Sequence, residues 1–326
     1  KTNHLNVTIS KKKFFNNFEN IIKVKDAPIS IPHEYPLYEL TKQMKGKVKV
    51  VLSGEGADEL FGGYSRVQKS PFDFKKGKFF GSLSDLNFVR KLFSIDNNFN
   101  FKNSDFKEFF LKRYKWFSKN EAKNIINKEI VNNINFNEVF LPWEFSKNFN
   151  SNNDELYNSV LLNFQKNHLQ CLLDRLDVMT MANSIEARVP FLEHEVIEFI
   201  NSVPFKYKIR WKSYFSKIKS IFSSSDKFTE INDVNKYLLR VCSKKYLPKK
   251  ISNEKKLGFP LPMNDWMNDD YVKQIVLDKN THDSGIFNKD EIQKLFSKSN
   301  LNDPYDFNGK KIWMIMNVQL WIKNYF

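Results

Sequence analysis

The chain has 326 residues, of which 41% are hydrophobic, 15% aromatic and 27% charged, a balance that excludes an intrinsically disordered or fibrous protein. No stretch approaches the roughly 18 uncharged apolar residues of a membrane span. Two cysteines, Cys171 and Cys242, are too few for a disulfide framework. We therefore expect a cytoplasmic protein without a membrane segment. The 52 Lys and Arg against 37 Asp and Glu give a net charge of +15, but the lysines are scattered among Asn, Ile and Phe, as in proteins from A/T-rich genomes, which favours a compositional origin over a nucleic-acid-binding surface.

The first part of the chain has the pattern of an α/β protein. Residues 5–9 alternate as in a short strand, and Ser10 is a candidate N-cap for a helix. The apolar face of that helix would consist of Phe14, Phe15, Phe18, Ile21 and Ile22. Three prolines, up to Pro36, predict a loop before a second helix over about 37–44. Residues 47–52 alternate and then become fully apolar, as in a strand that enters a buried parallel sheet.

Beyond residue 70 the sequence predicts helices and very little strand. Apolar periodicity favours helices near 106–118, 121–132, 154–182, 194–203, 214–222, 235–246, 289–298 and 310–325. Residues 70–105 are rich in Phe, Asn and Lys and predict no clear element. We therefore expect a large, mostly helical region after the α/β segment.

The motif SGEGADELFGGY, residues 53–64, is the strongest candidate for a functional site. Backbone N–H groups where a parallel strand ends and a helix begins favour phosphates, and Gly54 and Gly56 would let a ligand approach the backbone. Glu55, Asp58 and Glu59 place three carboxylates within five residues, and carboxylates beside phosphates commonly hold Mg²⁺. On spacing alone, an ordinary helix N-terminus with acidic residues that complement its dipole explains the motif equally well.

Two further segments carry charges that are candidates for a functional site, and the cations of the second would suit a polyphosphate. Glu186 and Arg188 precede an apolar Val-Pro-Phe run, so their charges would lie in an apolar setting and are expected to pair. Lys236 and Arg240 share one helix face, and Lys256 lies in a Gly- and Pro-containing loop that is able to reach over a ligand. Structural pairing and a solvated basic face explain both patterns without a ligand.

In this order, the segments resemble the synthetase domain of glutamine-dependent asparagine synthetases. The resemblance runs from about His4 to Trp266 and rests on SGEGADELFGGY (53–64), SIEARVPFLEHEVIEF (184–199), KYLLR (236–240) and KKLGFPLP (255–262). It implies an α/β fold in which a partial parallel-sheet ATP-pyrophosphatase (adenine nucleotide alpha-hydrolase-like) domain precedes a large, mostly helical region. The corresponding domains are residues 1–68, the C-terminal part of the nucleotide-binding domain, and residues 69–326, the helical part.

The resemblance also implies a reaction and its catalytic residues. ATP, with Mg²⁺, adenylates the side-chain carboxylate of aspartate, and ammonia attacks the β-aspartyl-AMP to give asparagine. Matched by position, Ser53 and Gly54 correspond to the turn that contacts AMP, and Asp58 to the residue beside Mg²⁺ and pyrophosphate. Glu55 corresponds to a glutamate assigned to the intermediate, and Lys256 to a loop lysine that binds pyrophosphate. Glu55 and Lys256 are therefore the expected catalytic residues.

The remaining candidates border the same implied site. Lys236 and Arg240 are second candidates for phosphate contact, and Asp177, Glu186 and Arg188 match the helix and loop beside the aspartate pocket. The chemistry agrees with these types of residue, because the departing pyrophosphate needs its charge neutralised by Mg²⁺ and a fixed cation. Ammonia must attack as the neutral molecule, so a nearby carboxylate that can accept a proton is useful.

Two parts of the family pattern have no counterpart in this sequence. The family's glutaminase domain begins with a nucleophilic Cys, and its synthetase domain carries an SGGxDSS pyrophosphate loop, whereas this chain begins at Lys1 and contains neither. We therefore expect a C-terminal part of a longer enzyme that takes ammonia from glutamine, with a homodimer as a further expected assembly and no nucleic-acid or membrane partner. Three alternatives stay open: a related amidotransferase that adenylates another carboxylate, a basic nucleic-acid-binding module, and a non-catalytic remnant kept for assembly.

The fragment interpretation makes a prediction about the isolated chain. Without the pyrophosphate loop, we expect no ATP–pyrophosphate exchange in the presence of aspartate, ammonia and Mg²⁺, because the leaving group would lack part of its binding site. Incorporation of labelled pyrophosphate into ATP measures the exchange. Exchange above the protein-free background would contradict the fragment interpretation.

Overall fold

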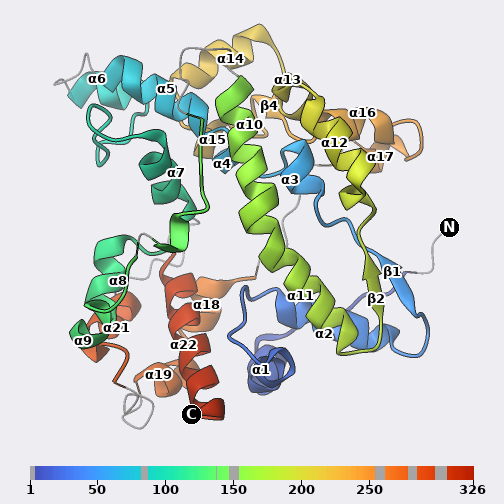
Figure 1. Cartoon of the computed structure of the whole chain (residues 1–326), viewed down its shortest axis with the longest axis vertical. Helices are drawn as coiled ribbons and strands as arrows, with labels where there is room; N and C mark the ends of the chain where they lie inside the picture. The colour runs from blue at the N-terminus through green and yellow to red at the C-terminus, as the bar shows by residue number, and fades with distance from the viewer. Residues whose placement is uncertain are drawn as a thin grey trace.

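The computed structural model describes residues 4–81, 87–136, 138–146, 154–252, 254, 261–277, 285–297 and 307–326, and helices dominate it (Figure 1). Up to residue 146 the helical elements are α1 (Lys11–Lys25), α2 (Glu34–Met44), α3 (Ala57–Phe61), α4 (Ser65–Gln68), α5 (Ser70–Gly81), α6 (Asn87–Leu92), α7 (Phe106–Tyr114), α8 (Lys119–Ile125), α9 (Lys128–Val131) and the 3-10 turn η1 (Glu138–Phe140). From residue 154 they are α10 (Asp154–Asn163), the π-helical turn η2 (Phe164–His168), α11 (Leu169–Met181), the 3-10 turn η3 (Pro190–Leu192), α12 (His194–Ser202), α13 (Phe205–Lys208), α14 (Tyr214–Ile221), α15 (Ser225–Phe228), α16 (Tyr237–Ser243), α17 (Lys249–Ser252), α18 (Met263–Met267), α19 (Asp270–Leu277), α21 (Lys289–Ser297) and α22 (Asn308–Tyr325). Most helices predicted beyond residue 105 are confirmed to within a few residues.

Four short strands form two small sheets in the described chain. β1 (Val50–Leu52) pairs in parallel with β2 (Glu186–Arg188), and β3 (Arg210–Trp211) pairs antiparallel with β4 (Asp233–Val234). The parallel pair agrees with the predicted α/β class, and the ATP-pyrophosphatase fold itself stays a proposal. The predicted strand over 47–52 is shorter than expected, and its apolar run is not buried, since Leu52 is 76% exposed.

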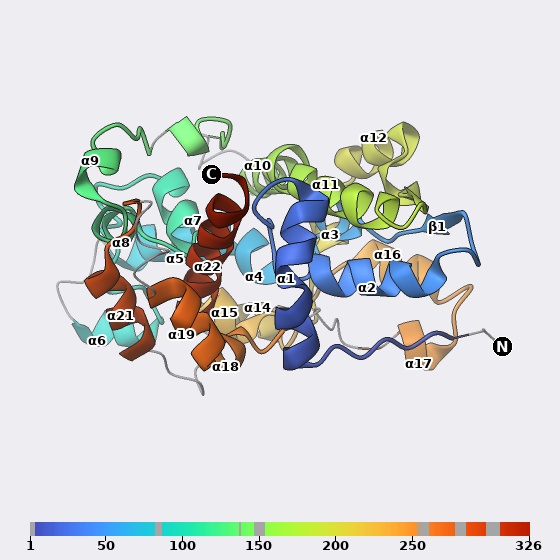
Figure 2. The ribbon, with the colours of Figure 1, turned by 90° about the horizontal axis from the view of Figure 1, so that it is seen from below.

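The N-terminal helices pack against the C-terminal helices. Ser10 Oγ accepts a hydrogen bond from Lys13 N (3.2 Å), as predicted for an N-cap, and the apolar face of α1 joins Trp266 and Trp313 in the largest hydrophobic cluster. Figure 2 shows α1 and α2 beside α11, with α22 and α18 next to them. Asn317 of α22 ties the loop after α1 in place, because its side-chain amide exchanges hydrogen bonds with Ile29 N (3.0 Å) and Ile29 O (2.7 Å).

Two details of the N-terminal prediction are wrong. Residues 5–9 form no strand; Ile9 packs against the cluster, whereas Leu5 is 42% exposed. α2 begins at Glu34 rather than near residue 37, because the Glu34 carboxylate accepts hydrogen bonds from Ser30 N (2.7 Å) and Ile31 N (3.3 Å). Pro36 therefore lies in the first turn of α2, where its missing N–H leaves no helical bond unmade.

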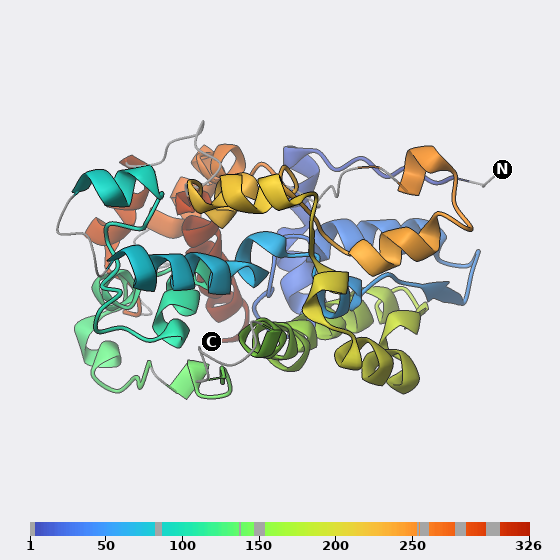
Figure 3. The same ribbon diagram turned by 90° about the horizontal axis from the view of Figure 1, so that it is seen from above.

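The Phe-rich segment that predicted no element contains α5 and α6 and forms a second hydrophobic cluster. The ring of Phe74 on α5 contacts Phe99, Phe101, Phe106 and Phe109, at centroid distances between 5.5 and 6.4 Å. Seen from above, α4 and α5 follow one another nearly in line (Figure 3), and α15 packs against both.

One long rod connects these parts of the molecule. α10, η2 and α11 run without a break over residues 154–181, close to the predicted 154–182. In Figure 1 the rod crosses the molecule diagonally, with α7 on one side and α12, β1 and β2 on the other. Within the described ranges, no helix has both the length and the apolar character needed to cross a lipid bilayer.

Candidate active site

The parallel sheet brings two of the predicted motifs together. Val50 pairs with Glu186 and Leu52 with Arg188, and Ser53 N, the first residue past β1, donates a hydrogen bond to Arg188 O (2.7 Å). The motif at 53–64 therefore begins where the strand of the second motif ends. β1, the turn 53–56 and α3 form the strand–turn–helix unit that the sequence predicted.

The two glycines of the turn differ in the space around the position that a Cβ would occupy. Gly56 has a φ of +88°, and a Cβ there would overlap Leu192 Cδ2 on η3, so this glycine is needed for the turn itself. A Cβ on Gly54 would meet nothing within 4 Å. Glu55 N donates to Ser53 Oγ (3.3 Å), which holds the turn in shape. Ser53 and Gly54 thus leave an accessible stretch of backbone at the end of β1.

Asp58 on α3 forms an ion pair with Lys236 from the distant helical part of the chain. The distance between Lys236 Nζ and Asp58 Oδ1 is 2.9 Å, and both side chains are about one-fifth exposed. Lys236 has a φ of +48° and immediately precedes α16. Gly63 makes room for the pair, because a Cβ there would overlap Asp58 Oδ1 and lie 2.7 Å from Lys236 Cε.

Glu55 forms an ion pair with Arg175 of α11, a residue that the sequence analysis did not single out. The Arg175 side chain is 12% exposed and that of Glu55 22%, so the pair is largely shielded from water. Arg175 Nε is buried and has no hydrogen-bond partner among the described residues. The sequence did contain a signal, since a buried arginine among the leucines of a long helix needs a partner, but it did not reveal which carboxylate.

Behind these two pairs lies a buried group of titratable side chains. Glu59 is 1% exposed, and the Tyr64 hydroxyl donates to Glu59 Oε1 (2.9 Å). Burial raises the pKa of the Glu59 carboxyl. The ring of Tyr64 contacts His168, whose Nδ1 lies 2.8 Å from the Tyr114 hydroxyl. Burial first, and then the Arg175 guanidinium, lower the pKa of His168 to about 4, so this imidazole is neutral at pH 7.

The three carboxylates of the turn do not converge on a single point. Glu55 pairs with Arg175, Asp58 with Lys236, and Glu59 with Tyr64. Among the residues that the structure describes, no three His, Cys, Asp or Glu side chains gather as a metal site. Mg²⁺ in nucleotide sites is commonly held by one or two carboxylates together with phosphate oxygens. Asp58, at the end of β1 and partly exposed, fits the part of such a single protein ligand.

The other predicted phosphate contacts have different surroundings. The guanidinium of Arg240 donates to Asn235 O (3.0 Å) and Glu254 O (2.7 Å), so it secures the backbone on either side of α16. Lys256 lies outside the described residues. Of the cations predicted to contact phosphate, Lys236 is therefore the one that the described residues place beside the 53–64 motif, where it pairs with Asp58.

The predicted aspartate-pocket residues lie on β2 and α11. Glu186 and Arg188 do pair (2.7 Å), but their side chains are 53% and 66% exposed, so the expected apolar setting is wrong. Both side chains are exposed to solvent at the β1–β2 sheet and do not enter a core. Asp177 is exposed on α11, two residues after Arg175.

Several known proteins are similar in sequence to this chain, one of them over nearly its whole length. Residues 1–323 match the sequence model of the family described as asparagine synthase. Asparagine synthetase (glutamine-hydrolyzing) 1 of Bacillus subtilis is 26% identical over 327 residues, which cover 98% of this chain and 47% of that protein. Asparagine synthetase (glutamine-hydrolyzing) 3 of the same organism is 25% identical over 64% of this chain and 29% of its own. Amidase chyE of Penicillium rubens is 30% identical over 37% of this chain and 17% of its own. The chain spans about half the length of the first of these relatives and less of the other two.

Alanine at Gly63 should disrupt the Asp58–Lys236 pair, because the added methyl group overlaps the Asp58 carboxylate. We expect Gly63→Ala to lower the free energy of unfolding by about 1–3 kcal/mol, measured by urea denaturation. Gly54→Ala is the matched control, since a Cβ there meets nothing within 4 Å, and should stay within about 0.5 kcal/mol of the parent chain. Equal stability of the two variants would show that Gly63 does not hold the pair.

The neutral state of His168 should make stability depend on pH. Its pKa lies near 4 in the folded chain against an ordinary value of 6.5, so its contribution is complete above pH 6.5 and is lost as the pH falls toward 4, about 3 kcal/mol in total. We expect His168→Gln to flatten the free energy of unfolding between pH 6.5 and pH 4. His194→Gln, at an exposed histidine on α12, should keep the slope of the parent chain, and an identical slope in all three proteins would rule out this role for His168.

Proposed function

This chain belongs to the asparagine synthase family, and we propose that it carries the ATP-using site of a ligase that converts aspartate to asparagine. The proposed route adenylates the side-chain carboxylate of aspartate, releases pyrophosphate, and lets ammonia attack the β-aspartyl-AMP. The match over residues 1–323 supports the family. The charged residues near the turn at 53–56, above all Asp58 and Lys236, support a reaction at the phosphates of ATP.

The observation that carries the proposal is the ion pair between Asp58 and Lys236 at the carboxyl end of β1. In parallel sheets, ligands bind outside the carboxyl ends of the strands, and transfer to or from a polyphosphate needs cations for its oxygens and a carboxylate for its metal ion. The pair supplies one of each from segments far apart in the sequence. We infer that the two side chains hold one another until nucleotide enters, when Lys236 turns to the phosphates.

The other candidate residues are assigned roles beside the Asp58–Lys236 pair. Ser53 and Gly54 offer open backbone and a hydroxyl to AMP. Glu55 faces the reacting carbonyl and accepts a proton from the attacking ammonia, and Arg175, as a positioning residue, keeps the Glu55 carboxylate in place. Arg240 supports Lys236 indirectly by fixing the backbone of Asn235 and Glu254. Lys256 stays a proposed pyrophosphate contact.

The aspartate pocket is proposed at the open side of β2 and α11. Arg188 is suited to the α-carboxylate of aspartate because its guanidinium has donors beyond the single bond to Glu186. Glu186 and Asp177 are suited to the α-ammonium group. Their exposure in the described chain is consistent with a pocket that further residues complete.

Mg²⁺, when bound, would neutralise charge on the pyrophosphate leaving group. Asp58 is the proposed protein ligand. Lys236 then adds a second positive charge at the same edge of the sheet, and both favour the departure of pyrophosphate.

The names of two relatives support a further part of the proposal. The two Bacillus proteins are named as glutamine-hydrolyzing, so we propose that glutamine is the source of ammonia and that a glutaminase domain accompanies this chain. The division into an ATP-pyrophosphatase part (1–68) and a helical part (69–326), and a homodimeric assembly, belong to the same proposal.

Lys236 gives the sharpest test of the function. In the product of the complete gene, supplied with ATP, Mg²⁺, aspartate and ammonium, we expect Lys236→Ala and Asp58→Asn each to lower kcat/KM for asparagine formation by about 10²-fold or more. Mass spectrometry of the amino-acid products measures the rate. Lys273→Ala, at an exposed ion pair on α19, should leave the rate unchanged.

The same assay separates the competing functions. Full activity of Lys236→Ala would contradict the proposed site. An amide formed from another carboxylic acid, with aspartate unreacted, would identify the related amidotransferase instead. A folded protein that makes no amide from any acid would favour the non-catalytic interpretation.

A further inference from the structure

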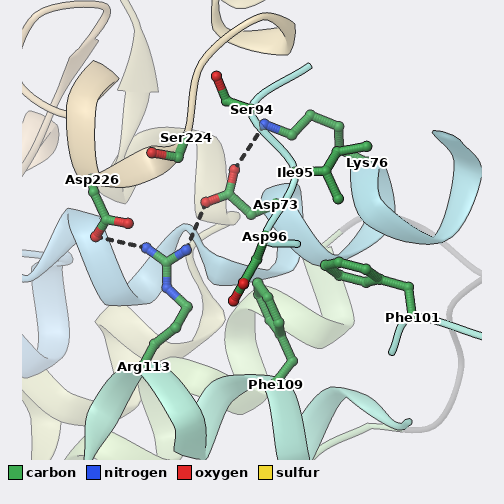
Figure 4. Close-up of a pocket in the computed structure, with 10 residues that line it drawn as sticks. All are labelled: Asp73, Lys76, Ser94, Ile95, Asp96, Phe101, Phe109, Arg113, Ser224 and Asp226. Atoms are coloured by element: carbon green, nitrogen blue, oxygen red, sulfur yellow. Dashed lines mark hydrogen bonds and ion pairs between the residues drawn. The ribbon is translucent and has the colours of Figure 1, made fainter. Parts of the chain in front are cut away.

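A polar cavity lies apart from the candidate active site. Its volume is about 260 Å³, and its walls come from α5, α7, the loop at 94–96 and the segment that leads into α15 (Figure 4). The lining includes five charged side chains, Asp73, Lys76, Asp96, Arg113 and Asp226. None of the residues around the turn at 53–56 takes part. A cavity of this size is sufficient for a metabolite of about ten non-hydrogen atoms.

Three of the charged side chains, Asp73, Lys76 and Arg113, are largely buried and are joined to one another. Asp73 is 5% exposed and lies between Lys76 and Arg113, as Figure 4 shows. Arg113 Nη1 lies 2.9 Å from Asp73 Oδ2, and Arg113 Nη2 lies 2.9 Å from Asp226 Oδ1. Ser225 N also donates to Asp73 Oδ2 (2.9 Å). These bonds hold α5, α7 and α15 together around the cavity.

Every charge of the lining already has a partner. Asp73 pairs with Lys76 and Arg113, and Asp226 with Arg113 and Arg66. Asp96 pairs with Lys112, whose Nζ lies 2.6 Å from Asp96 Oδ2. A ligand with a net charge would bring a charge that has no partner, whereas a molecule with one positive and one negative group brings no net charge. The pairing therefore favours a zwitterion over a simple anion or cation.

One acceptor in the cavity takes part in an ion pair but accepts no well-formed hydrogen bond from the described residues. Asp73 Oδ1 is buried and finds no hydrogen-bond donor among the described residues, although Lys76 Nζ lies 3.3 Å away. The Lys76 ammonium donates to Ser223 O (2.6 Å) and has further N–H groups. An α-amino acid carries an ammonium and a carboxylate on the same carbon atom. Its ammonium would donate a hydrogen bond to Asp73 Oδ1, and its carboxylate would accept one from the Lys76 ammonium.

The rest of the wall is apolar. Ile95, Phe101 and Phe109 line the cavity, and all three are at most 6% exposed. Such a surface favours a hydrocarbon side chain over a polar one. We propose that this cavity is a binding site for a free α-amino acid with an apolar side chain, held by Asp73 and Lys76.

Calorimetric titration of the chain with matched probes tests the site. L-Leucine and L-methionine carry both charges, whereas leucinamide lacks the carboxylate and 4-methylpentanoate lacks the ammonium. We expect saturable binding of at least one of the two amino acids, with one site per chain, and at least tenfold weaker binding of both single-charge analogues. Equal binding of an analogue, or no binding of either amino acid, would overturn the proposal.

Variants locate the binding in this cavity. Asp73→Asn keeps the shape of the side chain and should weaken binding about tenfold. Lys76→Gln removes the cation proposed for the ligand's carboxylate and gives a second variant that should also weaken binding if loss of Asp73 unfolds the chain. Asp270→Asn, at a 90% exposed side chain on α19, and Lys236→Ala, at the candidate active site, should bind as the parent chain does. Unchanged affinity in both cavity variants, or loss of binding in Lys236→Ala, would place the ligand elsewhere and overturn the inference.

Discussion

In the β1–β2 sheet, two segments far apart in the sequence are held in parallel register by backbone hydrogen bonds, and the last of these joins Ser53 N to Arg188 O. This pairing fixes the end of β1 and therefore the point at which the turn 53–56 begins. From there, α3 presents Asp58 toward Lys236, while the turn itself presents Glu55 toward Arg175. If the register slipped by one residue, the side chains of β1 would exchange faces and the turn would move by about 3.3 Å along the strand, which is more than either ion pair tolerates.

The basic composition of the chain has a consequence inside the fold. With 52 Lys and Arg, some cations lie in the interior, and each needs a partner. Lys69 lies 3.2 Å from the centroid of the Trp211 ring and 3.5 Å from Asp233 Oδ2, and burial lowers the pKa of this ammonium to about 8. Burial also lowers the pKa of Lys76. The excess of positive charge is therefore not confined to the surface. Carboxylates such as Asp233 are needed in the interior to neutralise buried lysines.

Sequence patterns predicted the helices well because amphipathic periodicity is a local property. The turn at 53–64 was also predictable, since a strand, glycines and acidic residues stand next to one another in the sequence. Arg175 was missed although it lies in a segment of interest, because periodicity identifies the face of a helix and not the distant carboxylate that the face meets. The exposure of Glu186 and Arg188 was missed for a similar reason, since the apolar residues around them are neighbours in sequence but do not cover them. Residues 70–105 predicted no element because phenylalanines occur on every side of the segment, and their rings pack against partners such as Phe106 and Phe109.

The π-helical turn at Phe164–His168 has a consequence for how the long rod tolerates changes in length. In a regular α-helix each residue advances the face by about 100°, so one additional residue would rotate everything that follows. A wide turn absorbs such a residue locally, and α11 can then keep Arg175 facing the turn 53–56 while α10 keeps Leu156 and Val160 in the Phe-rich cluster. Phe164 and His168 at its two ends both contact the ring of Tyr64. The rod thus behaves as two helices whose faces are set separately, that of α10 by the Phe-rich cluster and that of α11 by the ion pair between Arg175 and Glu55.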